Sequence, residues 1–132
     1  QGKRVYISRD RVKRRQIVNE LDVCRDLQTR GFEIVHPEEM TFTEQVHYFR
    51  SAKTIVAPHG GGLTNMVWAE RPRVIELMPQ PYNNPCYWLA SSAIAEQYGM
   101  IVLDGFCDHS AMAKNLRVDI DKINHVLEQM ET

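Results

Sequence analysis

The sequence has few of the residues and segments that would assign a function by themselves. Its three cysteines, Cys24, Cys86 and Cys107, are widely spaced and form no C-x-x-C pair, so neither a zinc site nor a disulfide framework is predicted. No apolar run approaches the ~20 residues of a membrane span, and no secretory signal peptide is recognised. We therefore expect reduced thiols and a cytoplasmic location in a bacterium, or the Golgi or ER lumen if the source is eukaryotic.

Net charge is nearly absent as well. Sixteen Lys and Arg against 17 Asp and Glu leave a formal charge of −1, which argues against a non-specific nucleic-acid binder. Five of the basic residues are gathered in one short segment at 9–15, RDRVKRR. The 132 residues suit a single domain, 1–132, with one hydrophobic core. Because no initiator Met precedes the first strand-like segment, we expect a domain excised from a longer protein.

What the sequence does contain is a regular alternation of apolar patterns. Short apolar runs predict strands at 3–8, 32–36, 54–57, 73–78 and 100–103. Apolar residues at three- and four-residue steps predict helices at 16–30, 41–52, 63–69, 87–98 and 120–130. Candidate N-caps are Thr41 or Thr43 for the second helix and Asp119 or Asp121 for the last, and Gly31 and Gly99 are the expected stops of the first and fourth.

Alternating strands and helices are typical of an α/β domain with a mostly parallel sheet. Right-handed crossovers leave few topologies, and we expect a Rossmann-like three-layer domain whose five strands have the order 2-1-3-4-5. In such sheets ligands bind at the carboxyl ends of the strands, beside the point where the strand order reverses. The first strand ends at Ser8-Arg9 and the third at His59-Gly60, so these two segments should face each other.

The third predicted strand leads into a glycine loop, residues 54–65, TIVAPHGGGLTN. Backbone N–H groups in such a loop, helped by a helix N-terminus, can bind an anion. The loop is not the GxGxxG fingerprint of dinucleotide-binding domains, which follows the first strand, nor a P-loop, since no Gly-Lys-Ser/Thr follows. A tight turn with close packing of strand and helix is the alternative.

Other polar residues close to the predicted switch point are candidates for the same site. Arg9 could grip a phosphate with both guanidinium nitrogens, and Asn19 with Glu20 could orient the arginines. His59 could donate to phosphate, act as a general acid or base, or be structural. Glu76 lies inside a buried strand, where a carboxylate is costly unless it is bonded; it could accept hydrogen bonds from two sugar hydroxyls or pair with an internal cation.

Taken in order, several motifs resemble those of the family 61 glycosyltransferases, also described as capsular polysaccharide biosynthesis proteins. They are the strand end YISR with a later Arg and Asn-Glu, the block GFEIVHPEEMTFTEQVHYFRSAKTIVAPHGGGLTN, and VIELMP. The resemblance covers about residues 5–79. It implies the C-terminal, donor-binding domain of a two-domain GT-B enzyme that transfers a hexosyl or pentosyl group, is inverting and needs no metal or other cofactor.

The resemblance also implies site residues and partners. The donor-binding residues would be Ser8, Arg9, Arg15, Asn19, His59, Gly60, Gly61, Gly62, Leu63, Asn65 and Glu76, with His59 the one candidate for a catalytic role. Gly61 departs from the family, which usually has Ala there. The partners would be a nucleotide sugar, a glycan acceptor and the missing N-terminal domain, in which the unassigned catalytic base could lie, so that the isolated domain would have little activity. The alternative is a non-catalytic module that binds a nucleotide or a phosphorylated metabolite.

Overall fold

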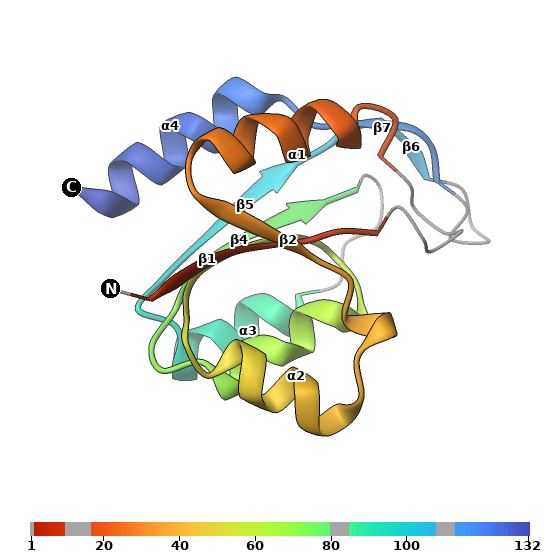
Figure 1. Ribbon diagram of the computed structural model, residues 1–132. Coiled ribbons are helices and arrows are strands. Elements are labelled where there is room, and N and C mark those ends of the chain that lie inside the picture. The colour runs from red at the N-terminus through yellow and green to blue at the C-terminus, as the bar shows by residue number, and fades with distance from the viewer. Residues whose placement is uncertain (1, 10–16, 80–84, 108–112) are drawn as a thin grey trace.

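The computed structural model describes residues 2–9, 17–79, 85–107 and 113–132. Its centre is a parallel five-stranded sheet with the order β2-β1-β3-β4-β5, as predicted (Figure 1). The strands are β1 (Lys3–Ile7), β2 (Phe32–Val35), β3 (Ala52–Pro58), β4 (Arg73–Met78) and β5 (Gln97–Val102). The chain is therefore a Rossmann-like α/β domain.

Helices cover both faces of the sheet and make three layers (Figure 1). The helices α1 (Glu20–Thr29) and α4 (Ile120–Glu131) lie on one face, and α2 (Phe42–Phe49) and α3 (Cys86–Ile94) lie on the other. Alternate strand residues enter separate cores: Tyr6 packs under α1 and α4, whereas Val5 packs with the opposite layer. This burial on both faces explains why the strands read as nearly continuous apolar runs.

The starts of α2 and α4 carry the capping residues expected from the sequence. Thr41, rather than Thr43, accepts a hydrogen bond from the backbone N–H of Glu44, whose side chain accepts from Thr41 N–H in return. Asp119 caps α4 by accepting from the N–H of Lys122. Helix α4 then buries the apolar face that its spacing predicts, through Ile123, Leu127 and Met130.

Three predicted helix boundaries are wrong. The second helix ends at Phe49, and Ala52, its predicted last residue, begins β3. The first helix begins at Glu20 and not at 16; Ile17 instead makes a parallel bridge to Leu116. The helix expected over 87–98 ends at Ile94, and β5 begins at Gln97. Gly99 is thus a strand residue and not a helix stop. A Cβ there would lie 3.2 Å from side-chain atoms of both Val126 and Met130, so the glycine lets α4 pack onto the sheet.

Two further elements differ from the prediction. The segment after the glycine loop is a 3-10 helix, η2 (Gly61–Trp68), and not an α-helix. Its backbone bonds keep a three-residue spacing: Leu63 N–H donates to Gly60 O, and Ala69 N–H donates to Met66 O. The turn-rich segment before α4 contains an unpredicted antiparallel pair, β6 (Asp104–Cys107) with β7 (Ala113–Arg117). Within the described ranges, no helix combines the length and apolarity needed to cross a bilayer.

Candidate functional site

A cavity of about 340 Å³ opens at the carboxyl edge of the sheet, where β1 and β3 lie side by side. The end of the first strand at Ser8-Arg9 and the glycine loop after the third strand, which were predicted to face each other, both contribute to this cavity. Its polar lining and its glycines come from Ser8 and Arg9 after β1, Glu38 after β2, Gln45 of α2, and Gly61 and Gly62 after β3. The cavity therefore lies at the topological switch point of the sheet, where ligands of open α/β domains bind.

Close packing explains two of the three glycines in the loop. Gly60 has φ 161°, an extended conformation open to any residue, so conformational freedom is not the reason for it. A Cβ on Gly60 would lie only 2.0 Å from Nη1 of Arg9, and a Cβ on Gly62 would lie 3.0 Å from Cγ2 of Ile7. The loop thus makes room for the Arg9 guanidinium and for the end of β1.

Gly61 is different, because a Cβ there would meet no atom within 4 Å. This open space accommodates the Ala that the related family usually has at the position. The departure at Gly61 therefore leaves the packing of the loop unchanged.

A buried carboxylate holds the end of β1. One oxygen of Glu20, Oε1, accepts hydrogen bonds from the hydroxyls of Tyr6 (3.1 Å) and Ser8 (2.9 Å) and from the backbone N–H of Arg9 (3.1 Å). The side chains of Ser8, Arg9 and Glu20 are all buried. The sequence predicts for Glu20 only a role in orienting the arginines. The signal for its larger role is its place in the first turn of the helix that follows β1, within reach of the strand's end.

Asn19, the residue before α1, is directed elsewhere. Its Nδ2 donates to the carbonyl of Val118 (2.8 Å), and its Oδ1 accepts from the N–H of the same residue (3.0 Å). Asn19 therefore ties the start of α1 to the segment before α4 and does not line the cavity. Arg15, also predicted to bind the donor, lies outside the described residues.

Behind the glycine loop lies a buried chain of polar groups. Nδ1 of His59 is 2.5 Å from Oε2 of Glu76, while Tyr98 donates its hydroxyl hydrogen to Oε1 of the same carboxylate. Glu76 is fully buried and His59 is 4% exposed. Burial and the neighbouring Glu76 raise the pKa of Tyr98 well above its ordinary value, so that Tyr98 remains a donor. Both oxygens of Glu76 are thus engaged inside the protein, and His59 lies next to the cavity lining rather than in it.

Asn65 and Gln45 form the scaffold of the opposite wall. Nδ2 of Asn65 donates to Oε1 of Gln45 (2.9 Å) and to the carbonyl of Gly62 (3.0 Å). Nε2 of Gln45 donates to the carbonyls of Pro37 and Met40. Leu63, which was also predicted to bind the donor, is fully buried in the core beneath the loop. The bonds of Asn65 favour the scaffold role over direct ligand contact.

One lining residue, Glu38, was not among the predicted site residues. It follows β2, which pairs with β1, and in dinucleotide-binding Rossmann domains an acid at the end of the second strand binds the ribose. In the described part of the chain, no group of three or more His, Cys, Asp or Glu side chains is arranged to hold a metal ion.

Comparisons with known proteins agree with this architecture. The sequence profile of the family described as Glycosyltransferase 61 matches residues 1–75. No curated protein matches the chain significantly. Among solved structures, the chain is similar to the CMP N-glycosidase BcmB of Clostridium botulinum, with a TM-score of 0.51 and 15% identity over 96% of this chain and 99% of that one. At this identity the likeness concerns the fold alone.

Proposed function

Since the chain belongs to the glycosyltransferase 61 family, we propose that it binds the diphosphate of a nucleotide-sugar donor in the cavity between β1 and β3. The observation that carries this proposal is the meeting of the Arg9 guanidinium with the backbone of the glycine loop at the switch point. A guanidinium and convergent N–H groups are the donors that a diphosphate needs. The chain would then be the donor-binding half of a GT-B enzyme that makes a polysaccharide or another glycan.

The proposed transfer inverts the anomeric centre without a metal. A base removes the proton of an acceptor hydroxyl, whose oxygen attacks the anomeric carbon. The bond from that carbon to the diphosphate oxygen breaks, and its electron pair leaves with the nucleoside diphosphate. Arg9 and the amides of Gly61 and Gly62 stabilise the charge that develops on the leaving group. We assign the base to the N-terminal domain of the two-domain enzyme.

In this proposal His59 acts mainly by positioning the loop. Its backbone N–H donates to the carbonyl of Leu77 (2.9 Å), and its ring is held by Glu76. The ring of Tyr87 meets it edge-on, with 5.1 Å between centroids. These contacts fix the start of the glycine loop, and with it the space that Gly60 leaves for Arg9.

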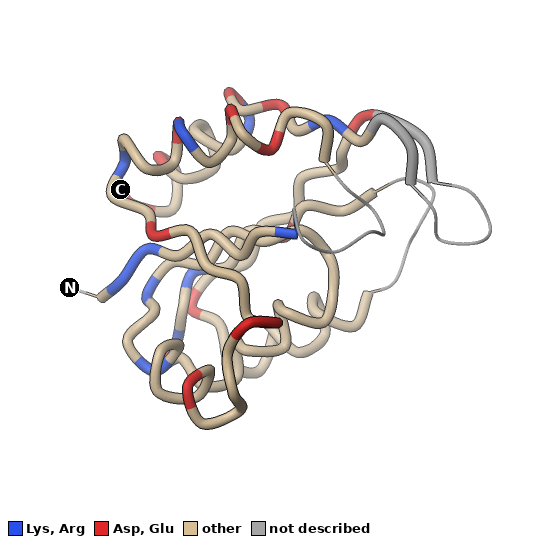
Figure 2. Tube along the Cα trace, turned by 45° about the vertical axis from the view of Figure 1, so that its right-hand side comes forward, with Lys and Arg blue, Asp and Glu red and all other residues tan. Residues whose placement is uncertain are grey.

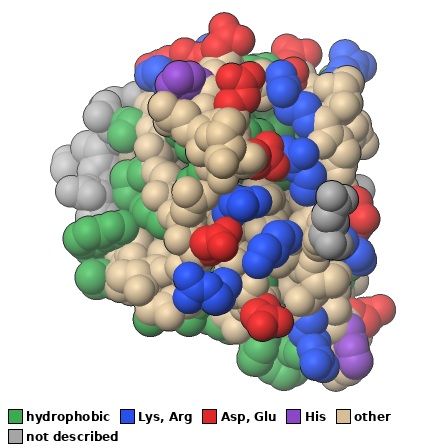
Figure 3. All heavy atoms as spheres, turned by 90° about the vertical axis from the view of Figure 1, so that its left-hand side faces the viewer, with side chains coloured by type: hydrophobic (Ala, Val, Ile, Leu, Met, Phe, Trp, Pro, Cys, Tyr) green, Lys and Arg blue, Asp and Glu red, His purple; other side chains and the backbone are tan. Residues whose placement is uncertain are grey.

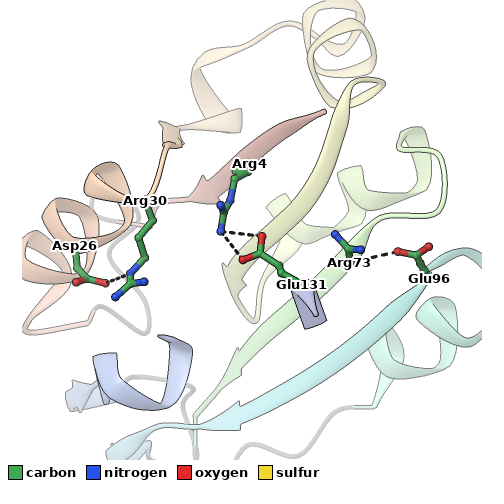
Figure 4. Close-up of polar contacts among 6 residues, drawn as sticks. All are labelled: Arg4, Asp26, Arg30, Arg73, Glu96 and Glu131. Carbon is green, nitrogen blue, oxygen red and sulfur yellow. Dashed lines mark hydrogen bonds and ion pairs between the residues drawn. The ribbon is translucent and has the colours of Figure 1, made fainter. Parts of the chain in front are cut away.

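A titration of residues 1–132 with nucleotides tests the proposal. We expect the 5′-diphosphates of uridine, guanosine, adenosine or cytidine to include one that binds at least roughly tenfold tighter than its monophosphate, and to do so in EDTA. Arg9→Ala should weaken that binding about tenfold or more, because charge-assisted hydrogen bonds are lost. The matched control is Arg30→Ala, whose guanidinium pairs with Asp26 at the far end of α1 (Figure 4).

Three results would contradict the proposal: no binding of any nucleoside diphosphate, binding that EDTA abolishes, or an Arg9→Ala variant that is folded and binds normally. Equal affinity for mono- and diphosphates would instead favour the alternative, a non-catalytic nucleotide module. The name of the structural neighbour, a CMP N-glycosidase, refers to a nucleoside monophosphate, so CMP belongs in the series.

A further inference from the structure

Glu38 places a carboxylate in the same cavity as Arg9. The residue is exposed and belongs to a short 3-10 turn, η1 (Pro37–Glu39). Within the described part of the chain, its side chain makes no hydrogen bond or ion pair. An acidic side chain in a cavity otherwise suited to anions needs an explanation, because it repels phosphate.

The turn that carries Glu38 is held firmly beside the end of β1. Residues Ile7 and Val35 are paired in the sheet, and Ser8 N–H donates to the carbonyl of Val35 (2.9 Å). Pro37 is buried, and its carbonyl accepts hydrogen bonds from the Gln45 side chain and from Met40 N–H. The Glu38 backbone is thus fixed in place before any ligand arrives, which is what a binding residue requires.

The sheet topology indicates what Glu38 would bind. In dinucleotide-binding Rossmann domains the phosphates lie at the switch point, while an acid that follows the second strand accepts a hydrogen bond from a ribose hydroxyl. The glycine loop of this chain follows β3 instead of β1, but β2 is next to β1 and the switch point lies on the other side of β1, as in those domains. The sequence pointed to Glu76 for such a contact, but Glu76 is fully buried and both its oxygens are engaged. Gln45 is also occupied, by two carbonyls and Asn65. Among the acids and amides that line the cavity in the described part of the chain, Glu38 remains to contact the ligand.

We propose that Glu38 binds the ribose of the nucleotide, accepting hydrogen bonds from its 2′- and 3′-hydroxyls while Arg9 binds the diphosphate. This inference rests on the proposed function. The opposite charges of Arg9 and Glu38 orient the ligand, since phosphate is attracted to one and repelled by the other. The cavity volume of about 340 Å³ lies at the low end of the ~300–1,000 Å³ typical of ligand pockets, and suits the ribose-phosphate part of a nucleotide.

The test compares ribonucleotides with 2′-deoxyribonucleotides. The probes are UDP, GDP, ADP and CDP, each titrated beside its 2′-deoxy counterpart. We expect the wild type to prefer the ribo form roughly tenfold, the effect of losing a hydrogen bond to a charged group. In Glu38→Ala the preference should fall to within about twofold, while the preference for di- over monophosphate is kept. Glu39→Ala is the matched control, because this neighbouring exposed glutamate does not line the cavity.

The outcomes separate this inference from the proposed function. If diphosphates bind but the wild type does not distinguish ribose from deoxyribose, Glu38 is not the ribose residue and the diphosphate site stands. Glu38 is also not the ribose residue if a folded Glu38→Ala variant keeps the preference for ribonucleotides, or if Glu39→Ala loses this preference to the same extent. If no diphosphate binds at all, the proposed function fails and the ribose assignment fails with it.

Discussion

Polar side chains are buried at the carboxyl edge of the sheet and exposed at its amino edge. At the carboxyl edge Arg9, Glu20, His59 and Glu76 are buried, and the two carboxylates are hydrogen-bonded to named partners inside the protein. At the amino edge, charged side chains of both signs are interspersed on the surface (Figure 3). A buried and well-bonded charge pair seldom stabilises a protein more than apolar residues of similar volume would, and exposed ion pairs contribute little. Selection for stability alone therefore does not explain the carboxyl edge.

The charged side chains at the amino edge form ion pairs at the surface. Arg4 and Arg73 lie in one cross-strand row with Thr54 between them. Figure 2 shows both basic and acidic positions on the side of the molecule where the two chain ends lie. Arg4 pairs with Glu131 at 2.9 Å, and Arg73 pairs with Glu96 at 3.3 Å (Figure 4). A cavity of about 320 Å³ adjoins these groups, but the chain's own carboxylates neutralise both guanidiniums. We regard this edge as structural: it fixes the last turn of α4 to β1.

The largest expected effect is the removal of the buried carboxylate behind the loop. Glu76→Ala should lower the free energy of unfolding by about 3–5 kcal/mol, because His59 and Tyr98 keep buried polar groups without their partner. Glu96→Ala, which breaks an exposed pair at the amino edge, should cost under about 1 kcal/mol. Urea denaturation measures both. Similar losses of unfolding free energy for the two variants would show that the polar groups at the two edges do not differ in their contribution to stability.

Next comes the acceptor that holds the end of β1. Glu20→Ala should cost at least about 1–3 kcal/mol, the penalty for leaving a buried donor unsatisfied, since three donors share this carboxylate. The control is Asp22→Ala, an exposed acid in the same first turn. It removes a similar interaction with the helix dipole but no buried bond. Equal destabilisation would reduce the role of Glu20 to that dipole interaction.

The glycines of the loop allow a comparison within the carboxyl edge. Gly60→Ala should displace the Arg9 guanidinium, weaken nucleoside diphosphate binding about tenfold or more, and cost about 1–3 kcal/mol through overpacking. Gly61→Ala should raise the free energy of unfolding by about 0.4–1 kcal/mol, because it restricts only the unfolded chain. Calorimetric titration measures the affinity of both variants for the nucleoside diphosphate, and thermal unfolding measures their stability. Stabilisation by both would mean that Arg9 is not held where the structure has it.

Alkaline pH tests the link between Glu76 and Tyr98. Because the pKa of Tyr98 is raised by burial and by Glu76, the folded protein keeps this proton to a higher pH than the unfolded chain. This stabilisation is complete below the unfolded pKa of ~10 and is lost as the pH rises toward the folded value. Tyr98→Phe should therefore flatten the decline of the unfolding free energy above about pH 10. An unchanged profile would show that Tyr98 does not donate to Glu76.

The smallest effect belongs to the amino edge. Glu131→Gln should lower the free energy of unfolding by under about 1 kcal/mol, because Arg4 and Glu131 are each about one-third exposed. About 1 M salt should remove most of the difference from wild type by screening. Urea denaturation at two salt concentrations measures it. A larger loss of unfolding free energy that does not depend on salt would mean that the Arg4–Glu131 pair is shielded from solvent, like the polar groups at the carboxyl edge.

Much of this contrast could be predicted from the sequence. The strand order and the meeting of Arg9 with the glycine loop followed from apolar periodicity and the hand of the crossovers. The 3-10 form of η2 did not, since apolar periodicity does not specify whether a short helical segment closes its backbone hydrogen bonds over three or four residues. Nor did the early end of α3, because Gly99 serves the packing of α4 and not the helix that precedes it.

The sequence by itself determined the five strands of the parallel sheet, their order and the edge of the sheet where a ligand would bind. Periodicity contains this information because each element must bury one face. Only the tertiary structure decided which polar side chains are partners there. Glu20 meets Tyr6 across 14 residues and Glu76 meets His59 across 17, while Glu38 is left to face the cavity. Such pairings depend on strand register and side-chain reach within a few tenths of an ångström, which no local pattern of residues specifies.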